Sequence, residues 1–400
     1  MPQNFSISLA DIPQDIAGII PLDLIKLWQE GEKTIEAHQE LLAPYMVEGT
    51  VVCSDSAGLS KLSQRVTAME AMKLVSEPKE IIYAYGSQIG RKPLGIWAAD
   101  NTQMFYGQDI MIDDILDQMI AAQKEIADLT VQVGMGIHTG NFIKIGDSLF
   151  GNDAIFIEEF AENYTAGKEI AVTEAVFLKL SDEKRKLLQR RKDGMHAKTF
   201  TIEYKDLISN AEKSSDTKYP IPFSPDFYEY LQSYASEELE THAGEMSQYK
   251  KQKVVILSKV IHKEHFFLLD TFTDWTFCNA AMIQEAKNHN IEIIKSNGDL
   301  GIFVCEEGSQ AVDFAKSLCQ TLSESDFEIN CGISQGEVLI FPLEKGGVDI
   351  AGGPVNIASK IAEDSGKSGV MLHECVSCLH NSIEDFCVTI SGIEIKGKVY

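Results

Sequence analysis

The sequence predicts an α+β protein in which one unit of alternating strands and helices occurs twice. Three pairs of similar segments keep one order and similar intervals: VVCSDSAGLSKL (51–62) with VVILSKVIHKEH (254–265), VGMGIHTGNFIKIG (133–146) with INCGISQGEVLI (329–340), and LFGNDAIFIEEFAE (149–162) with AGGPVNIASKIAE (351–363). A repeat of this length indicates two homologous domains and not a solenoid.

Each copy is predicted to form the same series of elements. A β-rich run at 50–54 or 253–257 leads into a helical segment, and a hairpin-like pair of strands follows with Asp or Gly-Asp at its turn. The next helix carries apolar residues every three or four positions: Ile112, Ile115, Leu116, Met119 and Ile120 in the first copy, Val312, Phe314, Ala315, Leu318 and Leu322 in the second. A further strand completes a mostly antiparallel sheet covered by helices.

The copies leave a lead segment and a linker. We predict an N-terminal lead segment at 1–47, a first domain at 48–205, a linker at 206–251 and a second domain at 252–400. The linker is polar and punctuated by prolines, then helical to about residue 250. The lead segment contains a predicted helix at about 21–43.

Charge and composition exclude several classes of function. The chain has 400 residues, 44% of them hydrophobic, and a formal net charge of −25, which repels nucleic-acid backbones and anionic lipid surfaces. We therefore expect no nucleic-acid partner and no membrane association, whereas a small nucleotide carried with its own divalent cation is compatible with this charge. The start of the chain lacks the features of a signal peptide, and no apolar run is long enough to span a membrane, so a cytoplasmic location is expected.

Cysteine usage points to a reducing compartment, because seven of the eight cysteines follow residue 270 and most lie beside apolar residues. The segment HECVSCLH (373–380) contains Cys375 and Cys378 with His373 and His380 nearby. No second ligand pair follows at zinc-site spacing, so the start of a helix is favoured over a structural zinc site.

Two aspartates of the first copy form a candidate metal site. Asp55 ends an apolar strand before a turn whose backbone N–H groups would face a phosphate, and Asp100 lies at the hairpin tip. If the two strands are neighbours, both carboxylates project from one end of the sheet, as Mg²⁺ on a triphosphate requires. Each could instead be a turn aspartate, but the pair in this context favours metal binding.

The second copy has different residues at the matching positions. Lys259 and Asp299 take the places of the two aspartates, so this copy cannot hold a metal in the same way. It has gained Lys295 where the first copy has Ile96, and Asp349 is the candidate partner of this lysine. Such a pair could read a purine edge, with the lysine donating to a ring nitrogen and the aspartate accepting from an exocyclic amine.

Asn356 and Lys360 are spaced to share one helix face and could both point at a phosphate, whereas the first copy aligns Ala154 and Glu158 there. Each copy thus lacks residues that the other has: the second lacks one metal carboxylate, and the first lacks the base and phosphate residues. We therefore predict one composite site, with metal from the first domain and base and phosphate contacts from the second.

These residues carry a resemblance to class III nucleotidyl cyclases, in particular to tandem, single-chain adenylyl cyclases arranged like the soluble adenylyl cyclases. The resemblance covers about residues 48–205 and 252–400, and its motifs are SDSAGLSKLS, GIHTGNFIKIG, IKSNGDLGIFV and VDIAGGPVNIASKIAE. It implies two ferredoxin-like domains that form a pseudo-twofold dimer within one chain, hence a monomer, with the active site at their interface.

By position, Asp55 and Asp100 resemble the family's two metal aspartates, which bind Mg²⁺ or Mn²⁺, and Ser56 would add a backbone carbonyl. Lys295 and Asp349 resemble the adenine-selecting pair.

Among the phosphate contacts, Asn356 resembles the residue that orients the ribose and the reacting phosphate, and Lys398 lies near the family's terminal-phosphate lysine. The implied activity is that of a signalling enzyme that converts ATP to cyclic AMP and pyrophosphate.

The sequence departs from the family pattern at several positions. Lys360 stands where the family usually has a transition-state arginine, and Gly134 where the first domain often has a phosphate-binding cation. The usual Gly-Asp turn is Ala99-Asp100, and Ile96 and Glu158 replace basic residues that resemble a bicarbonate-binding pair, so bicarbonate activation is not expected. We expect a slow enzyme. The alternatives are a pseudo-cyclase that binds nucleotide without turnover and a guanylyl cyclase, which would require an acidic or amide group in place of Lys295.

Overall fold

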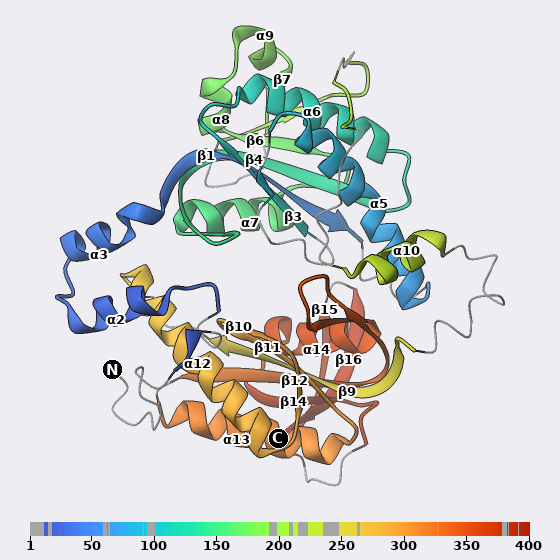
Figure 1. Ribbon diagram of the computed structural model, residues 1–400. Coiled ribbons are helices and arrows are strands. Elements are labelled where there is room, and N and C mark those ends of the chain that lie inside the picture. Colours follow the sequence, from blue (N-terminus) through green and yellow to red (C-terminus); the bar gives the residue numbers. More distant parts are fainter. Residues whose placement is uncertain are drawn as a thin grey trace. The chain divides into compact units, whose positions relative to one another are not determined.

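The computed structural model describes residues 12–14, 18–58, 62, 65–90, 92–93, 101–191, 198–207, 211–214, 223–234, 248–261, 265–325, 327–377, 382, 384–390 and 392–400. The chain divides into two compact units. The first-repeat unit comprises Leu42–Leu62 and Glu70–Pro222, and the second-repeat unit comprises Met1–Leu41, Ser63–Met69 and Phe223–Tyr400. Figure 1 shows one sheet with its helices in each unit.

The first-repeat unit is built on an eight-stranded sheet of order β2-β3-β1-β4-β6-β8-β7, with β5 paired to β4. Its strands are β1 (Met46–Ala57), β2 (Lys92–Pro93), β3 (Asn101–Gly107), β4 (Gln132–Ile145), β5 (Ser148–Phe150), β6 (Ile170–Thr173), β7 (Leu188–Arg190) and β8 (Thr199–Ile202). The helices along this stretch are α5 (Ala68–Ser87), α6 (Ile112–Ile126), α7 (Asn152–Tyr164), α8 (Glu174–Lys179) and α9 (Asp182–Arg185).

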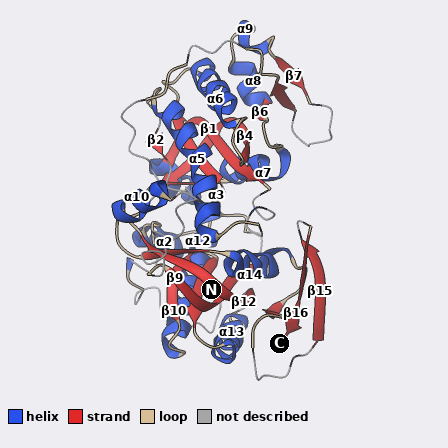
Figure 2. Ribbon diagram, turned by 90° about the vertical axis from the view of Figure 1, so that its right-hand side faces the viewer, coloured by secondary structure: helices blue, strands red, loops and turns tan. Residues whose placement is uncertain are grey.

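The second-repeat unit has an eight-stranded sheet of order β10-β11-β9-β12-β14-β16-β15, with β13 paired to β12. Its strands are β9 (Lys250–Ile261), β10 (Glu292–Asn297), β11 (Leu300–Cys305), β12 (Glu328–Pro342), β13 (Val348–Ala351), β14 (Gly369–His373), β15 (Glu384–Ile390) and β16 (Ile393–Val399). The helices between them are α12 (Leu268–Asn288), α13 (Gly308–Ser323) and α14 (Gly353–Asp364). Figure 2 shows β15 and β16 at one edge of this sheet.

The two sheets have the same strand order, which confirms the α+β class and the internal repeat. Each is antiparallel except for one parallel pair, β4 with β6 and β12 with β14. The parallel pair is reached through a helical crossover, α7 in one unit and α14 in the other.

Alternating residues of β9 build two separate cores, as the two-residue period of a strand requires. Val254 and Ile256 pack in a core with α12 and α13, whereas Val255 and Leu257 pack with β13 and α14. Helices therefore cover both faces of this sheet (Figure 1). Because both faces are buried, charged side chains of this sheet lie at its strand ends and turns, as Lys259 of β9 and Asp299 before β11 do.

Strand register fixes which residues of the two repeats are equivalent. Asp55 on β1 lies opposite Asn101 on β3 and Gly134 on β4. Lys259 on β9 lies opposite Leu300 on β11 and Asn330 on β12. The predicted equivalence of Asp55 and Lys259 is therefore confirmed.

The predicted equivalence of Asn356 with Ala154, and of Lys360 with Glu158, is wrong by one residue. Helix α7 begins after Gly151 and α14 after Gly352, and both glycines have positive φ (97° and 141°). Asn356 therefore corresponds to Ile155, and Lys360 to Glu159.

Burial supports this register, because Ile157, Phe160 and Ala161 of α7 match Ala358, Ile361 and Ala362 of α14. The difference in length lies before the helix. Phe150 of β5 matches Ala351 of β13, which is already the register of the helices, so the additional residues belong to the turn between β12 and β13 of the second repeat. An insertion inside the helix would rotate its buried face away from the sheet.

The lead segment forms two helices, α2 (Leu22–Glu30) and α3 (Ile35–Leu42), in place of the single helix predicted at about 21–43. Gly31 ends α2, and its backbone N–H donates to the carbonyl of Leu27. None of the helices in the described part of the chain has the length and apolar character that spanning a bilayer requires.

Helix α10 (Pro225–Ser233) lies in the predicted linker and packs within the second-repeat unit. Its Phe227 is fully buried and stacks on Phe341 of β12, with ring centroids 4.8 Å apart.

Candidate functional site

Lys295 and Asp349 come together as an ion pair in the second-repeat unit. The Lys295 Nζ lies 3.1 Å from Asp349 Oδ1 and 3.2 Å from Oδ2. Their side chains are 48% and 29% exposed, so both remain accessible to a ligand. The contact expected between them from the sequence is present, and its role in base recognition stays a prediction.

Local backbone features position the pair. The pairing of β10 with β11 is irregular between Ile293 and Lys295, and such a bulge re-aims the side chains that follow it. Asp349 lies on β13, after a turn in which Gly346 and Gly347 have φ of 92° and 83°. These left-handed conformations favour glycine.

The Asp349 carboxylate is oriented by its own strand, because Oδ1 accepts a hydrogen bond of 2.9 Å from the backbone N–H of Ile350. The pair therefore presents an ammonium donor beside a carboxylate acceptor on ordered strands. A planar ligand edge with one acceptor and one amine donor would satisfy both groups.

On the first-repeat unit, Asp55 is half-buried near the end of β1 and Ser56 is buried beside it. A carboxylate and an adjacent backbone carbonyl are the oxygen ligands that Mg²⁺ accepts. Asp100, Ala99 and Ile96 lie outside the described residues, so the predicted partner of Asp55 is not described. Within the described ranges, no group of three or more His, Cys, Asp and Glu side chains is placed to hold a metal ion.

In the second-repeat unit, the residues equivalent to Asp55 and Asp100 form an ion pair. Lys259 Nζ lies 2.6 Å from Asp299 Oδ2, and the two side chains are 36% and 23% exposed. The backbone N–H of Val260 also donates to the carbonyl of Asp299 at 2.8 Å. A lysine ammonium thus lies against the carboxylate at the position where a metal ion was predicted for the first repeat.

Asn356 and Lys360 lie one helical turn apart on α14, and both are partly exposed. The backbone N–H of Asn356 donates to the Gly352 carbonyl in the first turn of the helix. Lys398 lies on a different element, β16, opposite Leu372 on β14, and is exposed.

The packing around position 134 requires a glycine. A Cβ at this position would lie 2.2 Å from Thr165 Oγ1 and 2.9 Å from the Ala166 carbonyl oxygen. The first repeat therefore has no room for a basic side chain at this position without moving the segment that follows α7.

Glu158, on α7, contacts the sheet of the first-repeat unit. Its Oε1 accepts a hydrogen bond of 2.6 Å from Gln103 Nε2 on β3. Burial raises the pKa of the Glu158 carboxyl, with the Gln103 hydrogen bond acting in the opposite direction and the charge of Glu162 adding to the rise.

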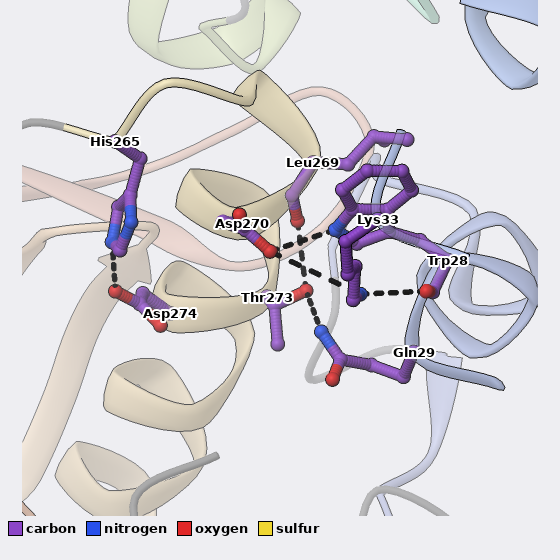
Figure 3. A network of polar contacts seen from close by, with 8 residues as sticks. All are labelled: Trp28, Gln29, Lys33, His265, Leu269, Asp270, Thr273 and Asp274. Carbon is purple, nitrogen blue, oxygen red and sulfur yellow. Dashed lines mark hydrogen bonds and ion pairs between the residues drawn. The ribbon is translucent and has the colours of Figure 1, made fainter. Parts of the chain in front are cut away.

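Two contacts were not predicted from the sequence. The Lys259–Asp299 pair had a usable signal, since alignment had already placed these residues at the positions of Asp55 and Asp100. The contact of the lead segment with α12 had no signal in the sequence. Trp28 is fully buried, and its Nε1 donates a hydrogen bond of 2.7 Å to Asp270 Oδ1 (Figure 3). Lys33 Nζ donates to the Trp28 carbonyl at 2.6 Å.

The fold has a counterpart among solved structures. The chain is similar to a class III adenylyl cyclase-like ATP-binding protein from Pseudomonas aeruginosa, with a TM-score of 0.51 at 13% identity over 82% of this chain and 83% of that chain. This chain has a class III adenylyl cyclase-like fold. The resemblance to class III cyclases is thereby confirmed at the level of the fold.

Other solved cyclase structures are similar to parts of the chain. They include the adenylyl cyclase CyaB from P. aeruginosa (TM-score 0.34, 14% identity, 39% of this chain and 94% of that chain). They also include the guanylate cyclase domain of RhGC from Catenaria anguillulae in complex with GTP (TM-score 0.35, 14% identity, 40% of this chain and 98% of that chain). No protein-family model matches the sequence, and no curated protein matches it.

Proposed function

We propose that this chain is an adenylyl cyclase that converts ATP to cyclic AMP and pyrophosphate. The observation that carries the proposal is the Lys295–Asp349 pair, a donor and an acceptor held 3.1 Å apart and open to solvent. Adenine offers the complementary edge, because its ring nitrogen accepts from lysine and its amine donates to aspartate. Guanine presents a carbonyl where adenine has the amine, so Asp349 disfavours GTP.

The metal half of the site is assigned to Asp55 and Asp100, with the Ser56 carbonyl as a further ligand. The second repeat provides an internal template for this assignment. Residues at the two equivalent positions, Lys259 and Asp299, are in direct contact at 2.6 Å. Two carboxylates at such a distance repel each other unless a cation lies between them, which favours Mg²⁺ or Mn²⁺ binding in the first repeat. The bound ion would neutralise charge on the triphosphate.

The phosphate contacts are assigned to Asn356, Lys360 and Lys398. Asn356 would orient the ribose and the reacting phosphate, and the two lysines would neutralise charge as the ribose 3′-oxygen attacks the α-phosphorus. The proposal requires the two repeats to pair within one chain, so that metal and base residues face one nucleotide. It describes a monomeric, cytoplasmic signalling enzyme with ATP as its small-molecule partner.

The second candidate is a cyclase-like protein that binds ATP without turnover. It is favoured by the packing at Gly134, which leaves no space for a basic side chain at that position, and by the description of the Pseudomonas protein as cyclase-like and ATP-binding. Lys360 in place of an arginine points the same way, since an ammonium cannot form a planar bidentate contact with phosphate.

Single-turnover formation of cyclic nucleotide separates the two candidates. Purified protein is mixed with saturating Mn²⁺ and either ATP or GTP, and Lys360→Arg is compared with the parent. An adenylyl cyclase forms cyclic AMP from ATP in preference to cyclic GMP from GTP. Lys360→Arg raises the rate about 10-fold with little change in ATP affinity, because a planar contact strengthens as charge builds on the phosphate.

The matched control is Lys287→Arg, the same exchange at an exposed position near the end of α12, where no effect is expected. ATP binding is measured independently by calorimetry. Binding of ATP with no product from the parent or from Lys360→Arg would reject the enzyme and support the binding protein. Absence of both binding and product would reject both candidates.

A further inference from the structure

A cysteine–histidine pair lies on the second-repeat unit at the end of β14. His373 Nδ1 is 2.8 Å from Cys375 Sγ, and the Ser334 Oγ on β12 is 3.7 Å from the same sulfur. The Cys375 thiol also lies 3.3 Å from the Gln335 carbonyl oxygen. None of these residues belongs to the proposed nucleotide site.

The thiol is exposed and is held by an ordered corner. Cys375 is exposed, whereas the next residue, Val376, is buried in the core that α13 forms with the sheet. The Val376 N–H donates to the His373 carbonyl at 3.1 Å, and the Glu374 N–H donates to the Lys396 carbonyl on β16 at 2.9 Å. The backbone on each side of Cys375 is therefore fixed, so its contact with His373 does not depend on a free loop.

The first repeat makes the same corner without this pair. The parallel registers match Ile170 with Val370 and Val172 with Leu372, which places Thr173 and Ala175 at the positions of His373 and Cys375. The buried valine is retained as Val176. The fold therefore requires neither the histidine nor the cysteine.

We propose that Cys375 is a modification site, a nucleophilic thiol activated by His373 that takes low-molecular-weight disulfides. In the reaction, His373 accepts the thiol proton and the resulting thiolate attacks one sulfur of the disulfide. A new sulfur–sulfur bond forms at Cys375, the bond of the small disulfide breaks, and the released thiolate takes up the proton. Two electrons pass from Cys375 to the small disulfide, so no further oxidant is needed.

The environment of the sulfur favours the thiolate. Protonated His373 can donate its Nδ1–H, and Ser334 can donate its hydroxyl proton, which gives the anion two donors. Burial raises the pKa of the Cys375 thiol, but the polar contacts of the sulfur, the largest of which is with His373, outweigh burial and hold the pKa below its ordinary value. At neutral pH a larger fraction of this thiol is ionised than of an ordinary cysteine.

Cys387 provides a comparison within the same molecule. It is also exposed and lies on β15 opposite Lys396, and the contacts described for it include no histidine. A difference in reactivity between Cys375 and Cys387 therefore reports on the local pair and not on exposure alone.

The test measures alkylation of the full-length protein by iodoacetamide, with each cysteine quantified by peptide mass spectrometry between pH 6 and pH 9. Cys375 should react about 10-fold faster than Cys387 at pH 7, with a midpoint below the value of about 8.5 that is ordinary for a thiol. His373→Thr, which installs the residue of the first repeat, should reduce the difference to about 2-fold without changing the rate at Cys387. Oxidised glutathione should form a mixed disulfide at Cys375 in the parent and none in Cys375→Ala.

The pH profile of the parent requires no variant, so the proposal stays testable even if His373→Thr folds poorly. Equal rates and equal midpoints for Cys375 and Cys387 would overturn it. It would also be overturned if the preference for Cys375 persisted in a folded His373→Thr protein. The outcome is independent of nucleotide turnover, so failure here leaves the proposed function untouched.

Discussion

The two repeats share one sheet topology but differ in charge at equivalent strand ends. Asp55 on β1 corresponds to Lys259 on β9, and the small Gly134 corresponds to Asn330, whose side chain bonds the Ala362 carbonyl and the Gly369 N–H. The apolar cores and helix positions are alike. The comparison teaches that the fold tolerates opposite charges at this corner, so the charges there are free to be used for binding.

The difference concerns the residue that faces a carboxylate near the end of a buried strand. In the second repeat this residue is Lys259, whose ammonium lies 2.6 Å from Asp299. The first repeat has Asp55 at the place of this lysine. Under the proposed function, Asp55 would bind a divalent cation, whereas the Lys259–Asp299 pair would not.

The largest expected effect is therefore confined to the first repeat. Asp55→Asn keeps the size of the side chain but removes the charge that the proposed function assigns to metal binding, so cyclic AMP formation should fall on the order of 1000-fold. The measurement is single-turnover product formation over a range of Mn²⁺ concentrations. Asp147→Asn, in the exposed β4–β5 turn, is the matched control and should behave as the parent. Unchanged turnover in a folded Asp55→Asn protein would remove the metal assignment.

A smaller effect is expected on the second repeat, where the proposed function places base recognition. Lys295→Glu removes the donor and places a negative charge beside Asp349, so the use of ATP should fall about 10- to 100-fold. The free energy of unfolding should fall by only about 1 kcal/mol, because the pair is 48% and 29% exposed and surface ion pairs contribute little.

Lys251→Glu controls for the change in net charge, since Lys251 is an exposed residue of β9 in the same unit. Turnover is compared with thermal unfolding of both variants. Equal losses of turnover in Lys295→Glu and Lys251→Glu would mean that net charge, and not base recognition, limits ATP use.

Much of the fold could be predicted from local patterns. Apolar alternation and helical spacing identify strands such as β1 and β9 and helices such as α6 and α13, because these periods reflect burial directly. The Lys295–Asp349 contact was predicted because a lysine leaving an apolar strand needs a partner. The alignment of α7 with α14 was wrong by one residue because sequence similarity alone does not show where residues are inserted, whereas the buried face of a helix fixes its register.

Contacts between distant segments were beyond local reasoning. The burial of Trp28 against α12 joins residues 242 positions apart through the hydrogen bond to Asp270, and no local pattern identifies such a partner. The break of the lead helix at Gly31 had a local signal, since glycine commonly ends helices. This signal was missed because the segment on both sides of Gly31 was interpreted as one helix.

The smallest effect is expected at the Lys259–Asp299 ion pair of the second repeat. Lys259→Met keeps the length of the side chain and removes the cation, leaving Asp299 in a partly exposed position where water can solvate it. Because Lys259 and Asp299 are 36% and 23% exposed, the free energy of unfolding should fall by about 1 kcal/mol or less. ATP binding and cyclic AMP formation should remain within about 2-fold of the parent, because Lys259 and Asp299 neutralise each other and are not expected to contact the nucleotide.

The measurements are urea unfolding and single-turnover product formation, with Asp299→Asn as the reciprocal variant. Both variants should show a similar small loss of stability if the ion pair alone is disrupted. A loss of turnover in Lys259→Met comparable to that of Asp55→Asn would show that Lys259 contacts the nucleotide. The two equivalent corners would then share one function, and the division of charge between the repeats would have to be assigned anew.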